Sequence, residues 1–263
     1  MSRFGDNIDV VGSGPPPKVA AFERDVSEQL RQLLMFETGR IVINAIWALF
    51  RQPSPRRVRI VPWTAQALNA DADAVSLPDA TPRGLQPLDG TGRPVVGPRG
   101  TGVGSDAVIR YSPLRWESDA GGWSYDTRRI WQTVTGHPPP APGDDRGEVL
   151  LHELVHAYRD LLGVRHSRPM GLGYDTREEL IAIAVANLYN VERTRPLRAG
   201  HNANSIPNYR ASMGTPEFRH TLLGTMAEMP ALTNALARVD VSENLFARYA
   251  TPTLADLFFG TTY

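Results

Sequence analysis

The chain has 263 residues, a formal net charge of zero and no cysteine. Its length and its 41% apolar content suffice for one sizeable hydrophobic core, so we expect a single domain with insertions. A zero net charge gives no general attraction to nucleic acid, and we expect no nucleic-acid partner. The absence of cysteine excludes disulfides, thiolate metal ligands and a cysteine nucleophile, which leaves His, Asp and Glu as candidate metal ligands.

No segment of the sequence predicts a membrane span or a cleavable signal peptide. Charged residues recur through the first thirty positions, and the apolar stretch Ile41–Phe50 is too short to cross a bilayer. We therefore expect a soluble protein, and any export is expected to use a route without a cleaved signal.

The N-terminal third predicts helices packed on strands. Residues 1–17 end in the run GSGPPP and are expected to form a flexible or strand-like arm with a stiff linker. From Lys18 apolar residues recur every three or four positions, which predicts a helix that ends near Gly39. A second helical segment follows at Ile41–Phe50, and Arg56–Trp63 alternates as a strand does.

The middle of the chain is poor in apolar periodicity. Residues 64–105 are rich in Gly, Pro, Asp and Thr, which predicts a Gly/Pro-rich insertion, with a possible hairpin near Val95-Val96. Ala107–Tyr111, with the sequence AVIRY, is the next strand candidate. A further turn and strand are expected within Trp116–Trp131.

A capped helix is predicted after a proline-rich lead-in. Asp144 and Asp145 precede the run RGEVLLHELVHAYRDLLG, so acidic residues stand at the positive end of the helix dipole. An apolar stripe follows, and Gly163 lies where a C-terminal glycine belongs. This helix carries the strongest chemical signal in the sequence.

His152 and His156 are four residues apart on that helix, a spacing that places both imidazoles on one face, one turn apart. Two imidazoles so placed are close enough to bind one small cation. Glu153 lies one step round the helix, where its carboxylate can reach a water on the metal without being a ligand. This H-E-x-x-H pattern is the zincin motif, in which the glutamate takes a proton from the zinc-activated water.

A catalytic zinc needs a third protein ligand. The run DTREELIAIAVANLYN, residues 175–190, predicts a second buried helix, and either Glu178 or Glu179 could turn inward from its first turn. The same glutamates also suit capping boxes with Asp175 and Thr176. We prefer Glu179 as the ligand, because it shares a side of the helix with the core-facing apolar residues. Glu178 is then expected to orient a ligand imidazole.

The sequence HELVHA at residues 152–157, followed by EEL at 178–180, resembles the zinc core of the clostridial neurotoxin light chains. It resembles still more the NleD-type effector peptidases that pathogenic bacteria deliver into host cells. The resemblance covers about residues 148–201 and is thin elsewhere. In both families the second glutamate of the pair is the third zinc ligand, which implies Glu179. The resemblance also implies proteolysis of a host signalling protein.

Peptidases of this kind often present an arginine and a tyrosine to the scissile carbonyl in an Arg-x-x-Tyr pattern. Here Arg198 is followed three positions later by His201 instead of tyrosine. The resemblance implies that Arg198 stabilises the oxyanion, assisted either by His201 or by Tyr209 from the next turn. The alternative for Arg198 is a solvated surface charge.

Together these features predict an α+β, zincin-like zinc metalloendopeptidase, with helices packed on a small mixed or antiparallel sheet. An arm of residues 1–17 precedes a single catalytic domain of residues 18–263, in which the C-terminal region 216–263 is expected to pack on the core. Ala107–Tyr111 is expected to be an edge strand that pairs with a protein substrate, which is bound through an extended segment or an exposed loop. The expected cofactor is Zn2+, with Glu153 as general base and three ligands, His152, His156 and Glu179.

Two other functions remain open. One is an interbacterial toxin that applies the same peptidase chemistry to a bacterial target, and the other is a non-catalytic binding module stabilised by zinc. For the effector function, the resemblance implies secretion without a cleavable signal and delivery into the cytoplasm of a host or target cell.

Overall fold

The structure is a computed structural model that describes residues 1–53, 55–63, 70–75, 102–112, 145–166, 174–195, 197–198 and 215–250. Within these residues the chain forms a five-stranded mixed sheet with the order β1-β2-β3-β5-β4. The strands are β1 (Ser2–Phe4), β2 (Ile8–Val10), β3 (Val58–Pro62), β4 (Ala70–Ala74) and β5 (Ala107–Tyr111). β1 and β2 are antiparallel, β2, β3 and β5 run parallel, and β4 is antiparallel to β5.

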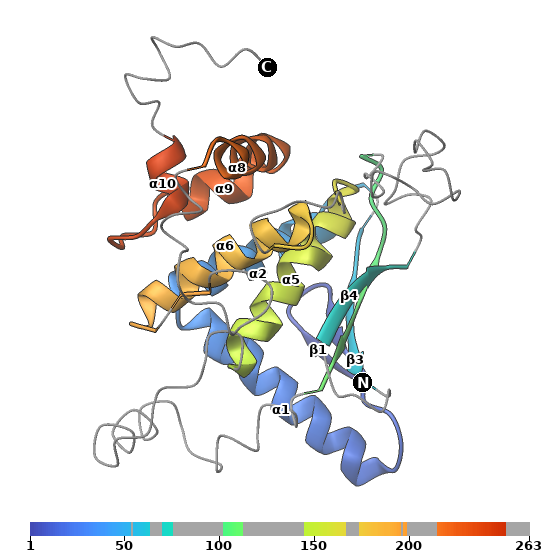
Figure 1. The fold of residues 1–263 in the computed structure, drawn as a ribbon. Helices are drawn as coiled ribbons and strands as arrows, with labels where there is room; N and C mark the ends of the chain where they lie inside the picture. Colours follow the sequence, from blue (N-terminus) through green and yellow to red (C-terminus); the bar gives the residue numbers. More distant parts are fainter. Residues whose placement is uncertain are drawn as a thin grey trace, which may run out of the picture.

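Seven helices are present in the described part of the chain, and they lie on one side of the sheet (Figure 1). They are α1 (Pro16–Leu34), α2 (Glu37–Phe50), α5 (Arg146–Leu162), α6 (Arg177–Glu192), α8 (Pro216–Glu228), α9 (Pro230–Leu236) and α10 (Leu245–Ala250). α1 packs on β1 and β2, whereas α5 packs on β4 and β5. α2 and α6 pack on α5, and the C-terminal helices contact α2 and α6 from outside. The protein is therefore of the α+β class.

The sheet separates a buried face from a polar one. In β3 the side chains of Val58 and Ile60 are fully buried, while Arg59 between them is exposed. Successive side chains of a strand point to opposite faces, so the alternation places the apolar set against the helices. On the other face Arg110 of β5 pairs with Asp71 of β4 at 3.3 Å. In the described strands the helices therefore pack on the apolar face of the sheet, and the face that carries these charged side chains is the other one.

The prediction that Ala107–Tyr111 is an edge strand is wrong. It forms β5, which pairs with β3 on one side and β4 on the other, and β4 is the edge. β4 lies within residues 64–105, where composition predicts an insertion. Its sequence ADADA lacks the β-branched and aromatic residues that favour strands, so pairing with β5 decides its conformation. The hairpin expected near Val95-Val96 and the elements expected in Trp116–Trp131 lie outside the described residues.

The boundary between the first two helices falls earlier than the sequence predicts. α1 ends at Leu34 and α2 begins at Glu37, so Gly39 lies in the first turn of α2. The carboxylate of Glu192, from the end of α6, accepts hydrogen bonds from the backbone N–H groups of Glu37 and Thr38 at 2.7 and 2.9 Å. The first N–H groups of a helix have no acceptor within the helix, so they need one from elsewhere. A Cβ at Gly39 would collide with the Leu33 carbonyl, so glycine permits the tight passage between the helices.

The predicted limits of the motif helix are confirmed. Asp145 is the N-cap of α5, and its side chain accepts a hydrogen bond from the Glu148 N–H at 2.9 Å. Gly163 ends the helix in the left-handed conformation, with φ of 68°. Between these ends nearly every residue of α5 is buried, because the sheet covers one side and α1, α2 and α6 cover others. Polar side chains in the middle of α5 are therefore held away from water.

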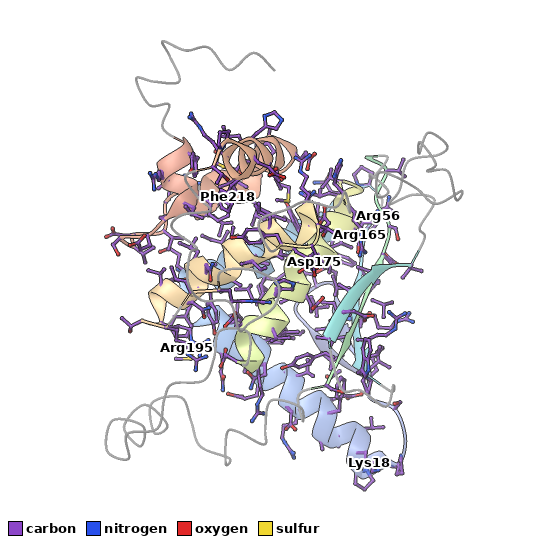
Figure 2. The ribbon with its side chains drawn as sticks, viewed as in Figure 1. Lys18, Arg56, Arg165, Asp175, Arg195 and Phe218 are labelled. Carbon is purple, nitrogen blue, oxygen red and sulfur yellow. The ribbon has the colours of Figure 1, made fainter. Side chains whose placement is uncertain are left out.

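The C-terminal region packs on the core over the residues described, as expected. Phe218 of α8 is fully buried, and its ring lies 5.9 Å from that of Tyr174 (Figure 2). Leu232, Leu236 and Phe246 of the following helices are buried as well. α8, α9 and α10 thus belong to the same hydrophobic core as the motif helix.

No single helix in the described ranges is both long and apolar enough to cross a membrane. α1 and α2 meet the length and composition criteria only when taken together, and the chain bends by 113° between them.

Replacing Gly163 by alanine should destabilise the protein more than replacing Gly102. Both residues have positive φ, 68° and 82°, which costs an alanine about 1–2 kcal/mol. A Cβ at Gly163 would also overlap the backbone nitrogen of Gly104, whereas a Cβ at Gly102 would meet nothing within 4 Å. Urea unfolding of Gly163→Ala and Gly102→Ala measures the difference; equal losses would show that the close approach contributes nothing.

Candidate metal centre

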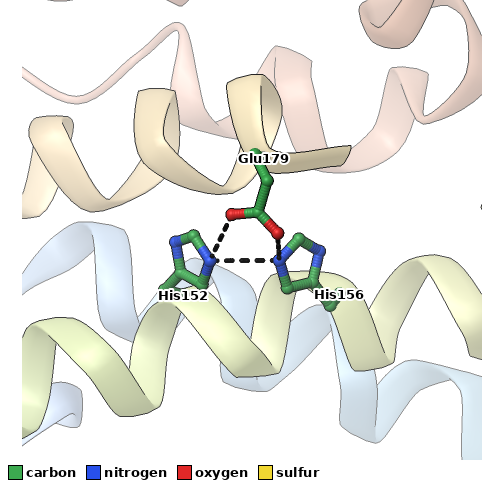
Figure 3. Close-up of side chains that lie close together, drawn as sticks. All are labelled: His152, His156 and Glu179. Atoms are coloured by element: carbon green, nitrogen blue, oxygen red, sulfur yellow. Dashed lines mark hydrogen bonds and ion pairs between the residues drawn. The ribbon is translucent and has the colours of Figure 1, made fainter. Parts of the chain in front are cut away.

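Two imidazoles meet on the buried face of α5. His152 and His156 are 5% and 6% exposed, and their Nε2 atoms lie 3.0 Å apart (Figure 3). The separation of four residues places them one helical turn apart, and the surrounding helices hold both rings in place. Two ring nitrogens so close together need a proton or a cation between them.

Glu179 completes the group from the first turn of α6. One carboxylate oxygen lies 3.0 Å from Nε2 of His152, and the other lies 3.3 Å from Nε2 of His156 (Figure 3). The ligand atoms of these three residues all lie within 4.8 Å of one another, so the group could hold a metal ion. Each protein ligand comes from a helix whose own core packing fixes its position.

The candidate ligand atoms are close enough to one another to share one small ion. The two Nε2 atoms lie 3.0 Å apart, and each of them faces a different carboxylate oxygen of Glu179, at 3.0 and 3.3 Å. Two neutral imidazoles and one carboxylate are also a ligand set that leaves a catalytic zinc one open position.

Glu179 belongs to a helix cap through its backbone only. The hydroxyl of Thr176 accepts a hydrogen bond from the Glu179 N–H at 3.3 Å, so Thr176 is the N-cap of α6 as the sequence predicts. In a capping box the glutamate side chain would return to the cap residue. Here that carboxylate lies against the histidines instead. One residue therefore serves the cap with its N–H and the histidine pair with its side chain.

Glu178 faces a different partner. Arg159 of α5 donates two hydrogen bonds to its carboxylate, at 2.7 and 2.8 Å. The Glu178 carboxylate also accepts a hydrogen bond from the His166 N–H and lies 3.8 Å from Nδ1 of His156. Glu178 thus lies behind the imidazole of His156, on the side away from Nε2.

Charges within the group are strongly coupled. Burial opposes the charged form of both imidazoles and lowers the pKa of His152 to about 4. At His156 burial also opposes the charge, but the charges of Glu179 and Glu153 and the hydrogen bonds to Glu178 and Glu179 together raise the pKa to about 10. The same attraction holds the pKa of Glu179 well below its ordinary value in spite of burial. A metal ion bound here would replace the proton on the His156 imidazole, so metal binding must release that proton.

Glu153 lies beside the group and is buried. Burial raises the pKa of its carboxyl to about 7, and the charges of His156, Glu179 and Asp71 also act on it. Asp71 belongs to β4, so Glu153 lies within electrostatic reach of both the histidine pair and the edge strand. A carboxyl group whose pKa is near neutrality can both accept and return a proton.

Arg198 is buried, and the surface alternative is therefore wrong. It is 7% exposed, and its backbone N–H and C=O are bound by the side-chain amide of Asn187 at 2.7 and 2.8 Å. Its Nε lies 3.8 Å from a carboxylate oxygen of Glu148. Its positive charge also contributes, after burial and closer charges, to the pKa values of His152 and Glu153. His201 and Tyr209 lie outside the described residues.

Sequence reasoning missed two charged residues near the group. Arg159 lies three positions after His156 and is fully buried; a charge inside the apolar stretch of α5 was the available signal. Glu228 of α8 contacts Arg159 at 3.0 Å, and no local pattern connects residues so distant in sequence. Tyr158 and Tyr174 are buried in the hydrophobic core.

No protein-family model matches the chain, and no curated protein matches it significantly. The resemblance to effector peptidases therefore depends on the motif residues themselves.

The cap and the metal ligand should be separable by substitution. Thr176→Ala removes a helix cap and should lower the free energy of unfolding by about 1 kcal/mol, with metal affinity retained. Glu179→Gln keeps the cap, because the N–H is unchanged, but should lose most metal affinity. Urea unfolding of the metal-free variants and equilibrium dialysis with zinc measure the two effects. If Thr176→Ala also lost zinc binding, the cap and the metal ligand would not be separable.

The Asp145 carboxylate, which caps α5, should make the stability of the protein depend on pH in the acidic range. Arg193 and Arg195 contact the Asp145 carboxylate at 2.6 and 2.7 Å and, against burial, hold its pKa well below 3.8. A depressed pKa contributes stability above pH 3.8 that is lost as the pH falls further. Asp145→Asn should therefore lower stability at pH 7 and weaken its decline below about pH 4. Asp6→Asn, which alters an exposed carboxylate, should retain the wild-type pH profile.

Proposed function

We propose that this protein is a zinc-dependent endopeptidase of zincin-like fold. The convergence of His152, His156 and Glu179, with Glu153 beside them, carries the proposal. Two histidines and a glutamate form a ligand set known from zinc peptidases, and their ligand atoms lie within 4.8 Å of one another. The position of the motif helix beneath a mixed sheet, with an edge strand alongside, supports the same function.

The chain's own residues supply the remaining chemistry. A zinc ion held by the three ligands would acidify water and polarise the scissile carbonyl. Glu153 accepts the proton of the attacking water and later donates it to the nitrogen of the leaving amine. The Arg198 guanidinium is the candidate among the described residues to donate hydrogen bonds to the developing oxyanion. Its charge already acts on Glu153 and His152.

The substrate is proposed to be a protein segment bound in extended form along β4. The Val75 N–H donates to the Asp106 carbonyl at 2.8 Å, and this register turns the amide and carbonyl of Ala72 away from β5. Arg165 donates a hydrogen bond to that Ala72 carbonyl at 3.2 Å, which agrees with a carbonyl that points outward from the edge of the sheet. In the described part of the chain no further strand pairs with β4. An edge strand beside the motif helix is suited to bind a peptide by strand addition.

The motif resemblance extends the proposal to biology. We propose a secreted bacterial effector that cleaves a host signalling protein, supported by the sequences HELVHA and EEL. Use of the same chemistry against a competing bacterium would be distinguished by toxicity on expression in bacterial cells. A non-catalytic zinc module would bind zinc and cleave nothing.

Glu153→Gln should separate the metal from catalysis. The substitution keeps the size of the side chain but removes the proton acceptor, so cleavage should fall about 10²–10⁴-fold while zinc stoichiometry stays at wild type. Metal analysis of protein purified without chelator, together with a proteome-wide cleavage screen, measures both quantities. Glu28→Gln, at an exposed position of α1, is the matched control and should retain cleavage.

Wild-type protein without bound zinc would refute the metal assignment. Zinc-loaded wild type whose cleavage profile coincides with that of Glu153→Gln would refute the peptidase and leave the metal site standing.

A further inference from the structure

A buried cluster of four charges joins α5, α6 and α8, and we call it the Arg159 cluster. Its members are Arg159, Arg177, Glu178 and Glu228, with side chains 0%, 18%, 4% and 14% exposed. Two positive and two negative charges make the cluster electrically balanced. Its residues come from three helices, and none of them is one of the proposed metal ligands.

Arg159 is the centre of the cluster. Its Nε and Nη2 donate to the two carboxylate oxygens of Glu178 at 2.7 and 2.8 Å, the parallel pair of bonds that a guanidinium alone can make. Nη2 also lies 3.0 Å from the Glu228 carboxylate and 2.7 Å from the Val164 carbonyl, so its two N–H groups are shared among three acceptors. One rigid planar group therefore holds α5, α6, α8 and the chain after α5 together.

Stability alone does not account for such a cluster. Removing charges from water costs several kcal/mol per ion, and apolar residues of similar volume often stabilise a core equally well. What a buried, hydrogen-bonded ion pair does supply is a defined geometry. At Glu178 that geometry is fixed by two guanidinium nitrogens, one on each carboxylate oxygen.

The residues that Arg159 holds in place are next to the proposed metal ligands. Arg159 follows His156 by less than one turn on α5, and Glu178 immediately precedes Glu179 in the first turn of α6. Glu178 also lies 3.8 Å from Nδ1 of His156. The ion pair therefore sets where the first turn of α6 meets α5, and with it the approach of Glu179 to the imidazoles.

Glu228 extends this connection to the C-terminal helices. Besides Arg159, it contacts Nη2 of Arg177 at 3.3 Å, and Nε of Arg177 donates to the Thr225 hydroxyl at 3.1 Å. Gly224 gives Arg177 room, because a Cβ there would lie 2.8 Å from Nη2. These residues thus join α8 to the beginning of α6. α8 packs on α6, and α9 packs on α8 and α2 (Figure 1).

We propose that Arg159 and Glu228 are positioning residues through which the C-terminal helices set the metal affinity of the His152–His156–Glu179 group. The inference rests on the proposed zinc site and adds to it a control by helix α8. Glu228 acts on Arg159, Arg159 acts through Glu178, and Glu178 places both Glu179 and the ring of His156. Residues that orient metal ligands typically change metal affinity about 10–100-fold when they are replaced.

The test measures zinc affinity of the full chain by competition with a chromophoric chelator. Arg159→Lys keeps the charge but loses the paired hydrogen bonds, and it should weaken zinc binding about tenfold or more. Glu228→Gln leaves Arg159 paired with Glu178, so the variant should fold, and it should weaken binding by up to about tenfold. Both should alter the visible spectrum of the cobalt-substituted protein, which reports ligand geometry.

Glu192→Gln is the matched control. Glu192 also joins two helices through hydrogen bonds, but it lies at the opposite end of α6, about 20 Å along the helix from Glu179. It should lower the stability of the metal-free protein without changing zinc affinity or the cobalt spectrum. This contrast separates positioning from general destabilisation.

The outcomes distinguish the two proposals. If wild-type protein binds no zinc, the zinc peptidase itself is refuted. If wild type binds zinc and Glu228→Gln matches it in affinity and cobalt spectrum, or falls only as far as Glu192→Gln does, the positioning role is overturned and the zinc site stands. Should Arg159→Lys fail to fold, Glu228→Gln alone decides.

Discussion

The candidate site depends on the packing of α6 against α5, because that contact brings one carboxylate to two imidazoles. Neither helix could form the group alone: α5 supplies a pair of nitrogens 3.0 Å apart, and α6 supplies the two oxygens that face them. A helix rotated by a single residue would present Glu178 in place of Glu179. In the structure Glu178 instead forms an ion pair with Arg159, and Glu179 is the carboxylate that faces the histidines.

Burial explains why so many charges near α5 are paired. The sheet and three helices exclude water from most of this helix, and an unpaired charge there would be costly. Asp145 is therefore held by two arginines, and Arg159 by two glutamates. Glu153 differs from these groups, because burial raises the pKa of its carboxyl to about 7. A carboxyl group in such an environment would suit the proton transfer that we propose for it.

Features with a local cause were predictable. The limits of α5 follow from an acidic N-cap and a glycine that adopts positive φ, and the Thr176 cap of α6 follows from the same rules. β5 was found because AVIRY carries strand-forming residues, but its place in the sheet was predicted wrongly. β4 has a sequence of alternating Ala and Asp, which indicates no strand, and only its ladder with β5 makes it the edge. Likewise, the sequence predicted a second helix from Ile41, whereas α2 begins four residues earlier at Glu37, where the Glu192 carboxylate accepts hydrogen bonds from the first N–H groups.

The amino-acid sequence by itself determined the helix of His152, Glu153 and His156, because a spacing of four residues places two side chains on one face of any α-helix. It also narrowed the third partner to two adjacent glutamates. The sequence favoured Glu179, and the tertiary structure places that carboxylate against the histidines while the Glu178 carboxylate pairs with Arg159. The contact of Glu228 with Arg159 and the role of β4 as the edge strand were decided there too. These features join residues distant along the chain, and no local pattern records which distant residues will meet.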